Sequence, residues 1–260
     1  MRIAIGLEYD GRGFCGWQSQ PSGCGIQDHL EKAVAEIAGE KLAVAAAGRT
    51  DTGVHASFQV AHFDATAARP LTAWVRGVNT YLPDGIAVAW AETVAEDFHA
   101  RFAVEERGYR YVLLNHPVRP GLMAGKVGWH HRPLDAEAMQ AAAHRLLGRH
   151  DFSAFRAAEC QARSPEKELR LARIMRQGDF LLCDFRADGF LHHMVRNIMG
   201  CLVHIGAGQA APGWIDELLA HKDRTRAAPT FMADGLYLAY IRYPSRFGLP
   251  ESGRSPWPCA

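Results

Sequence analysis

The densest group of chemically competent side chains is the segment 48–56, which reads Gly-Arg-Thr-Asp-Thr-Gly-Val-His-Ala. It lies between two strand-like stretches, and its glycines permit a constrained loop that presents Arg49 and Asp51 together. A carboxylate held in this way can act as a nucleophile or as a proton acceptor. Composition alone favours a plainer structure, a turn in which Asp51 accepts backbone hydrogen bonds and Arg49 is its surface partner.

A second group of candidates lies on a predicted helix, residues 190–205. Its core stripe has six apolar members: Leu191, Met194, Val195, Ile198, Leu202 and Ile205. The opposite face carries five other residues: His193, Arg196, Asn197, Gly200 and His204. Arg196 is there either solvated or directed into a cleft, and Gly200 would allow another backbone or a ligand to approach closely.

Tyr109 and Tyr111 alternate with Arg110, so both tyrosines should lie on one face of a strand and Arg110 on the other. Core packing is the default for such tyrosines. Stacking on a base is the functional alternative, and it gains weight because the segment opens a basic region.

Motifs for nucleotides and metals are missing from the sequence. Gly11-Arg12-Gly13 with its aromatic neighbours breaks the dinucleotide spacing and is an ordinary loop or, less favoured, an aromatic face for RNA. His192 and His193 would diverge by about 100° on a helix and could not chelate together. His130 and His131 are expected in a loop, without an assigned role. We therefore expect no catalytic metal and no cofactor.

The chain has 260 residues, of which 48% are hydrophobic and 22% charged, as in an ordinary globular protein. Its apolar runs are shorter than the roughly 20 residues that span a bilayer. Met1 leads into a strand-like segment rather than a signal peptide. These features predict a cytoplasmic protein without membrane segments. All six cysteines are then expected to be reduced thiols: Cys15, Cys24, Cys160, Cys183, Cys201 and Cys259.

The net charge of +1 conceals an asymmetry. Residues 1–100 carry 7 basic and 12 acidic side chains, whereas residues 101–176 carry 14 basic and 8 acidic ones. Arginine supplies 24 of the 29 basic residues, and its planar guanidinium suits bidentate contacts with phosphate. The middle segment is therefore either a solvated basic face or a surface for a polyanion.

The period of the apolar residues changes in a regular order along the chain. The first part predicts strand 2–9, helix 25–38, strands 42–48 and 57–64, a helix around 71–78, and strand 86–91. The second part predicts strand 108–114, helix 135–148, strands 168–176 and 179–186, helices 190–205 and 213–221, and strand 236–242. The first part has the order β-α-β-β-α-β, which is the split unit of ferredoxin-like folds, and the second part has the same order with one added helix.

We therefore predict an α+β fold with two ferredoxin-like halves, residues 1–102 and 103–246, followed by an irregular tail, 247–260. The halves are expected to join into a mainly antiparallel sheet with helices packed on it. A cleft between an acidic and a basic half is the expected place for an active site.

Taken together, seven segments in this order resemble the tRNA pseudouridine synthases that act on the anticodon stem-loop, and the resemblance runs almost end to end. The segments are Leu7–Gly11 with Gly16–Gln18, Gly48–His55, Asp97–Phe102, Tyr109–Tyr111, Asp151–Ser153 with Phe155-Arg156, His192–Asn197 and Gly235–Leu238.

The resemblance implies a role for each candidate residue. Asp51 matches the catalytic aspartate that attacks the target uridine, and Arg49 matches a residue that holds the flipped nucleotide open. Tyr109 matches the tyrosine that stacks on the base near the C5 proton. Arg196 matches the arginine paired with the aspartate, and Leu236 matches the apolar residue under the uracil.

The resemblance further implies a homodimer without cofactor or metal that modifies tRNA at positions thirty-eight to forty. We add His193, close to Arg196 in sequence, as a substrate-binding candidate. Thr52 departs from the family, in which alanine usually follows the aspartate. We expect the pairing with Arg196 to keep Asp51 charged at neutral pH. Whether Asp51 attacks C1′, attacks C6 or removes a sugar proton stays open.

Two other functions compete with the isomerase. A non-catalytic RNA-binding protein with two ferredoxin-like modules would account for the basic segment and the strand aromatics, but it leaves Asp51 without a purpose. A hydrolase with an aspartate nucleophile would need a general base or a metal to deliver water, and the sequence shows no candidate for either.

Overall fold

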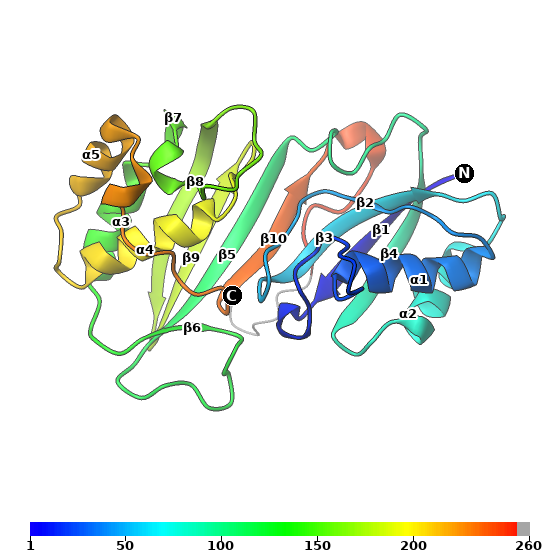
Figure 1. The fold of residues 1–260 in the computed structure, drawn as a ribbon, viewed down its shortest axis with the longest axis horizontal. Coiled ribbons are helices and arrows are strands. Elements are labelled where there is room, and N and C mark those ends of the chain that lie inside the picture. Colours follow the sequence, from blue (N-terminus) through cyan, green and yellow to red (C-terminus); the bar gives the residue numbers. More distant parts are fainter. Residues whose placement is uncertain (254–260) are drawn as a thin grey trace. The chain divides into compact units, whose positions relative to one another are not determined.

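A computed structural model describes residues 1–253 of the chain (Figure 1). The chain divides into two compact units, Met1–Glu106 together with the segment from Tyr237 onward, and Arg107–Leu236. This division differs from the predicted halves chiefly at the last strand. That strand groups with the first unit because Tyr237 pairs in parallel with His55.

The first unit is a mainly antiparallel sheet with the strand order β4-β1-β3. Two further strands, β2 and β10, pair with the remaining edge of β3. The strands are β1 (Arg2–Tyr9), β2 (Ala45–Ala46), β3 (His55–Asp64), β4 (Ile86–Val94) and β10 (Leu236–Arg242). This arrangement confirms the predicted strands, although β2 is reduced to two residues.

Two helices cover this sheet, α1 (Ile26–Ala38) and α2 (Val78–Tyr81), the latter preceded by a π-helical turn, Ala73–Gly77. Gly39 ends α1 in a left-handed conformation, φ 76°, as its position in the sequence predicts. A Cβ on Gly77 would lie 2.7 Å from the Ile37 Cδ1 atom. Glycine therefore lets the two helices pack closely.

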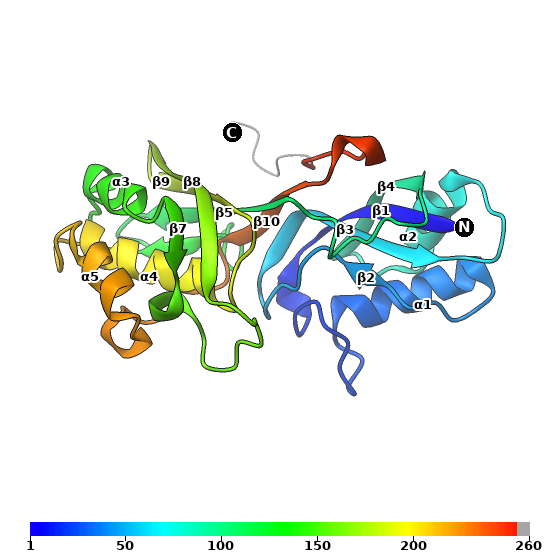
Figure 2. The same cartoon turned by 90° about the horizontal axis from the view of Figure 1, so that it is seen from above.

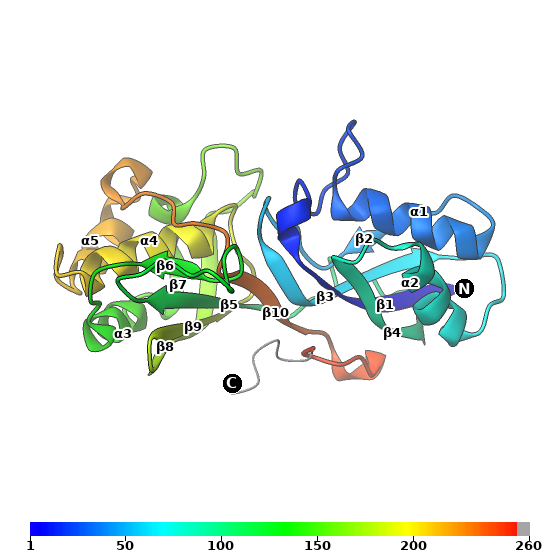
Figure 3. The same ribbon diagram turned by 90° about the horizontal axis from the view of Figure 1, so that it is seen from below.

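The second unit contains the strands β5, β9, β8 and β7 (Figure 2), which pair in this order and are all antiparallel. A short strand, β6, runs parallel to β5. The strands are β5 (Glu106–Asn115), β6 (Gly128–His130), β7 (Gly148–Asp151), β8 (Glu166–Gln177) and β9 (Phe180–Ala187). The helices are α3 (Ala136–His144), α4 (Met194–Gly206) and α5 (Trp214–His221). Helix α3 packs on β8 and on α4, as Figure 3 also shows. The α+β class and the mainly antiparallel pairing are confirmed.

Two predicted helix boundaries are wrong. Asp135 caps α3 as predicted, with its carboxylate accepting from the Glu137 and Ala138 N–H groups, but the helix ends at His144. Gly148, with φ 97°, begins strand β7 instead of closing the helix. Helix α4 begins at Met194 rather than at residue 190, because His193 has a left-handed backbone, φ 61°.

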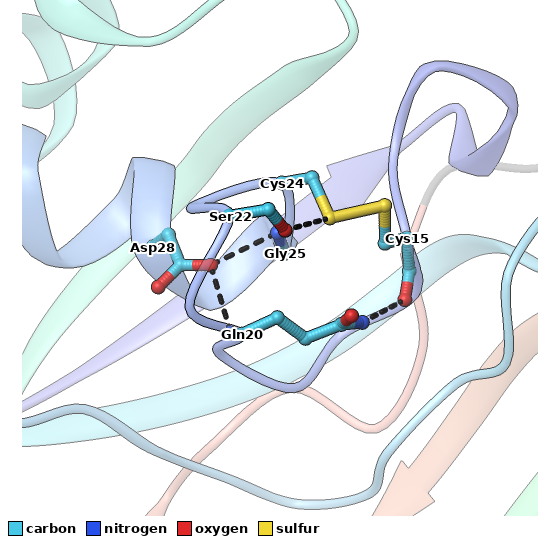
Figure 4. Close-up of a disulfide and its surroundings, with 6 residues drawn as sticks. All are labelled: Cys15, Gln20, Ser22, Cys24, Gly25 and Asp28. Carbon is cyan, nitrogen blue, oxygen red and sulfur yellow. Dashed lines mark hydrogen bonds between the residues drawn. A yellow bond between two sulfur atoms is a disulfide. The ribbon is translucent and has the colours of Figure 1, made fainter.

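The expectation that all six cysteines are reduced is also wrong. Cys15 and Cys24 form a disulfide (Figure 4). The loop between them folds back on itself, since the Cys15 N–H donates to the Cys24 oxygen (3.0 Å) and the Gln20 amide donates to the Cys15 oxygen (2.9 Å). The two cysteines are nine residues apart and belong to no recognised cysteine motif, so the sequence did not indicate this pairing. Cys160, Cys183 and Cys201 are free and buried.

Cys259 and the rest of 254–260 lie outside the described residues. The described part of the predicted irregular tail contains one antiparallel bridge, between Ser252 and Tyr240. Within the described residues, no helix is both long and apolar enough to cross a bilayer.

Candidate active site

Asp51 lies in a tight loop, residues 47–54, between β2 and β3. The Val54 N–H donates to the Asp51 backbone oxygen (3.1 Å), and Gly53 has a positive φ of 79°. The Arg49 side chain is exposed, whereas Asp51 is half-buried. The loop therefore presents both candidate side chains at the N-terminal end of β3.

Two buried polar side chains of the sheet, Tyr9 in β1 and Gln59 in β3, support this loop. The Tyr9 hydroxyl lies 2.8 Å from Thr50 Oγ1, and the Gln59 Nε2 atom donates to the Gly48 oxygen (2.7 Å). Gln59 is fully buried in β3. Sequence reasoning missed these residues. The available signal was a glutamine within a strand whose neighbours, Phe58 and Val60, are apolar.

The disulfide-closed loop contacts the Asp51 loop from the side. The Trp17 N–H donates to the Thr50 oxygen (2.9 Å). Gly16 has φ 86°, and a Cβ there would lie 2.7 Å from the same oxygen. Trp17 and Phe14 are buried, which agrees with the favoured prediction of an ordinary loop and contradicts the less favoured alternative, an aromatic face for RNA.

His55 anchors the far end of the Asp51 loop. It is buried, its Nδ1 accepts from the Gly11 N–H (3.1 Å), and its ring stacks on Tyr237 at 4.7 Å. The same nitrogen lies 3.2 Å from the Asp10 Oδ1 atom. His55 therefore joins β3 to β10 and to the turn after β1.

In the second unit, Tyr109 and Tyr111 lie on one face of β5. Tyr111 is fully buried and its hydroxyl donates to the Met232 oxygen (3.0 Å). Tyr109 is half-buried, with its ring set edgewise against Phe190 at 5.1 Å. Tyr111 is thus a core residue, and Tyr109 is the one of the two with exposed ring surface.

Arg110 lies on the other face of β5, as predicted, and forms an ion pair with Asp184 (2.7 Å). Arg173 contacts the same carboxylate at 2.9 Å. Burial raises the pKa of Asp184, but the hydrogen bonds from the two guanidinium groups outweigh burial and bring its pKa below the ordinary value. This cluster strengthens the β5-β9-β8 sheet.

Arg196 is bound to the segment that leads into β10. Its Nε donates to the Phe231 oxygen (3.0 Å), and its own backbone oxygen accepts from the Phe231 N–H (3.1 Å). A Cβ on Gly200 would lie 2.2 Å from the Pro229 oxygen, so the close approach predicted there is made by a backbone. The same segment ends at Leu236, which is buried. The second unit therefore links Arg196 and Leu236 through residues 229–236.

The polar face predicted for α4 is partly wrong. Asn197 is fully buried, where it donates to the Phe155 oxygen (2.8 Å) and accepts from Thr230 (2.7 Å) and Arg224 (3.1 Å). His193 precedes the helix instead of lying on it, and its ring lies 4.0 Å from that of His192. The divergence expected for two helical histidines does not apply to this pair.

The two other adjacent histidines are also placed differently. His130 is the last residue of β6 and pairs with Asn115, so it does not lie in a loop as predicted. Burial lowers its pKa, and His131 lowers it further. Both histidine pairs lie in the second unit. Among the described residues of that unit, no third metal-ligating side chain lies close to either pair.

A family model described as tRNA pseudouridine synthase matches residues 6–103 and 142–244. The chain belongs to the tRNA pseudouridine synthase family. The matched ranges include Asp51, Arg196 and Leu236, whereas Tyr109 lies between them. Members of this family are isomerases that act on uridine in tRNA.

Full-length relatives agree with this assignment. The chain is 73% identical to "tRNA pseudouridine synthase A" of Thiobacillus denitrificans over 100% of both chains. It is 60% identical to the protein of the same name from Dechloromonas aromatica, over 96% of each chain. A third such protein, from Chromobacterium violaceum, is 59% identical over 96% of each chain.

Proposed function

We propose that this isomerase converts uridine to pseudouridine in the anticodon stem-loop of tRNA, at positions thirty-eight to forty, with Asp51 as its nucleophile. We further propose that it works in the cytoplasm as a homodimer. The observation that carries the proposal is the half-buried Asp51 on a loop fixed from two sides, in a chain of this family.

The reaction breaks the bond between N1 of the base and C1′ and forms a bond between C5 and C1′. The C5 proton is lost and N1 gains a proton, so the substrate is neither oxidised nor reduced. A carboxylate suits this sequence because it can bond to the substrate and then depart. In our proposal Tyr109 stacks on the base near C5, Arg196 pairs with the carboxylate, and Leu236 lies under the uracil. Arg49 and His193 contact the nucleotide.

Asp51→Asn tests this role, because the amide has the same shape but cannot act as the nucleophile. We expect turnover of unmodified tRNA to fall at least about 1000-fold while tRNA affinity stays within about twofold. Asp84→Asn, the same change at an exposed position, is the control. Near-normal turnover by Asp51→Asn would exclude the proposed nucleophile. Mapping the isomerised uridines would test the tRNA positions.

The basic segment 101–176 is the proposed tRNA-binding surface. Its exposed arginines include Arg119, Arg132, Arg149 and Arg163. Binding through phosphates releases counterions, so affinity should fall steeply with salt, and each lost contact should lower the slope of the log–log plot by about 1. Replacing these arginines by glutamine, singly and together, and titrating tRNA between low and moderate salt measures this slope. An unchanged slope in the combined variant would move the binding surface elsewhere.

A further inference from the structure

Gln59 has an orientation that its buried partners determine completely. Its Nε2 donates to the Gly48 oxygen (2.7 Å) and, in a longer contact, to the Tyr9 hydroxyl oxygen (3.4 Å). Its Oε1 accepts from the Val60 N–H (3.2 Å). A carbonyl oxygen can only accept and a backbone N–H can only donate, so the flipped amide would lose both backbone contacts.

This orientation places the Gln59 amide beside the Tyr9 hydroxyl. The Tyr9 oxygen accepts from Gln59, and the same hydroxyl lies 2.8 Å from Thr50 Oγ1, in a hydrogen bond for which either hydroxyl can supply the proton. Gln59, Tyr9 and Thr50 are therefore connected in one series of hydrogen bonds. The strands β1 and β3 thereby hold Gly48 and Thr50, the residues on the two sides of Arg49, and Asp51 follows directly.

We propose that Gln59, Tyr9 and Thr50 are positioning residues, which act on the reaction by holding the backbone that carries Asp51. The inference rests on the proposed nucleophilic role of Asp51. A displaced nucleophile reacts slowly even when substrate binds normally, and an error of about 1 Å can cost roughly 100-fold in rate. The hydrogen bonds that connect Gln59, Tyr9 and Thr50 prevent such displacement before tRNA binds.

Tyr9→Phe removes one member of the series and leaves the ring in place. The matched control is Tyr243→Phe in the same unit, where an equally buried hydroxyl donates to the Ala100 oxygen (2.7 Å). A purely structural role predicts the same small effect from both changes. Positioning predicts that the single-turnover rate at saturating tRNA falls about 10-fold or more in Tyr9→Phe alone, with KM unchanged.

Changes at Thr50 test the end of the series. Thr50→Val keeps the shape but loses the hydroxyl, and we expect a 10-fold to 100-fold loss of single-turnover rate. Thr50→Ser keeps the hydroxyl and should stay within about threefold of the unmodified protein. Loss of rate in both variants to the same extent would contradict the inference, because it would show that the hydroxyl is not what matters.

Gln59→Met removes two donated contacts and one accepted contact and should be slower than Tyr9→Phe. Its control is Asn79→Leu, which removes one donated and one accepted side-chain contact in the same unit, to the Val88 oxygen (2.9 Å) and N–H (2.7 Å). Hydrogen exchange of the peptide 47–55 gives a readout apart from turnover. Exchange should accelerate in Gln59→Met and Tyr9→Phe and stay unchanged in Asn79→Leu and Tyr243→Phe.

The two proposals fail in different ways. Full activity of Asp51→Asn would show that Asp51 is not the nucleophile, and the proposed positioning of Asp51 would then have no catalytic purpose. If Asp51→Asn is inactive while Tyr9→Phe and Thr50→Val turn over as fast as Tyr243→Phe, the nucleophile stands and the positioning role is refuted.

Discussion

The loop of Asp51 and the helix of Arg196 are fixed in different ways. The loop has little core of its own and depends on a few neutral hydrogen bonds from Tyr9 and Gln59 and on the neighbouring Trp17 backbone. Helix α4 is buried along most of its length, and Arg196 is tied to the Phe231 backbone. The loop can therefore be loosened without unfolding its unit, whereas changes inside α4 should cost stability.

Among the changes that test this comparison, the largest effect should come from Arg196→Met, which removes the charge and keeps the aliphatic stem. In our proposal this guanidinium pairs with the Asp51 carboxylate, so turnover should fall by roughly 100-fold to 1000-fold, with only a modest loss of tRNA affinity. Arg145→Met, at a surface ion pair with Asp216, is the control. Kinetics that separate kcat from KM decide the matter, and near-normal kcat would refute the role.

Asn197→Ala should sharpen the contrast through stability. It removes the hydrogen bonds of Asn197 to the Phe155 oxygen, the Thr230 hydroxyl and the Arg224 guanidinium, although Arg224 still donates to Thr230 (3.1 Å). We expect about 3 kcal/mol lower free energy of unfolding in urea, against about 1 kcal/mol for Tyr9→Phe. Equal losses would mean that the helix and the loop are supported alike.

The smallest effect concerns pH. Burial, helped by the charges of His99 and Arg2, lowers the pKa of His62 from 6.5 to about 4. Between these two pH values the unfolded chain therefore binds more protons at His62 than the folded chain does. The contribution of the neutral His62 to the free energy of unfolding is fully present above pH 6.5 and is lost as the pH falls toward 4. His62→Gln keeps an acceptor for the Ala100 N–H and should flatten this slope in urea titrations. An unaltered slope would contradict the buried neutral imidazole.

Asp184 provides the counterpart in the second unit. Its pKa lies below the ordinary value, so its contribution is present above that value and is lost only as the pH falls through the lowered pKa. The two units should thus lose stability in different acidic ranges.

Period and capping signals were enough to predict most of the fold. Alternating apolar residues predicted strands β1 and β5, and Asp135 and Gly39 predicted helix caps; both strands and both caps are present in the structure, although β1 is buried on both faces. The start of α4 was missed because a left-handed histidine carries no sequence signal comparable to that of glycine.

The candidate site was predictable only in part. The Asp51 loop stood out by composition, and the remaining candidate roles came from the resemblance. The supporting residues were not predictable, because Tyr9, Gln59 and Thr50 meet only when β1 and β3 pair. Such contacts depend on strand register, which the separate segments do not reveal.

The disulfide between Cys15 and Cys24 closes a loop that supports the Asp51 loop, so this support depends on the oxidation state of the two cysteines. A dithiol reductant in the buffer would open the ring that presents Trp17 to Thr50, while glutathione disulfide would close it again by exchange. Preparations purified with and without reductant are then two covalent forms of one enzyme, and their rates should be measured and reported separately.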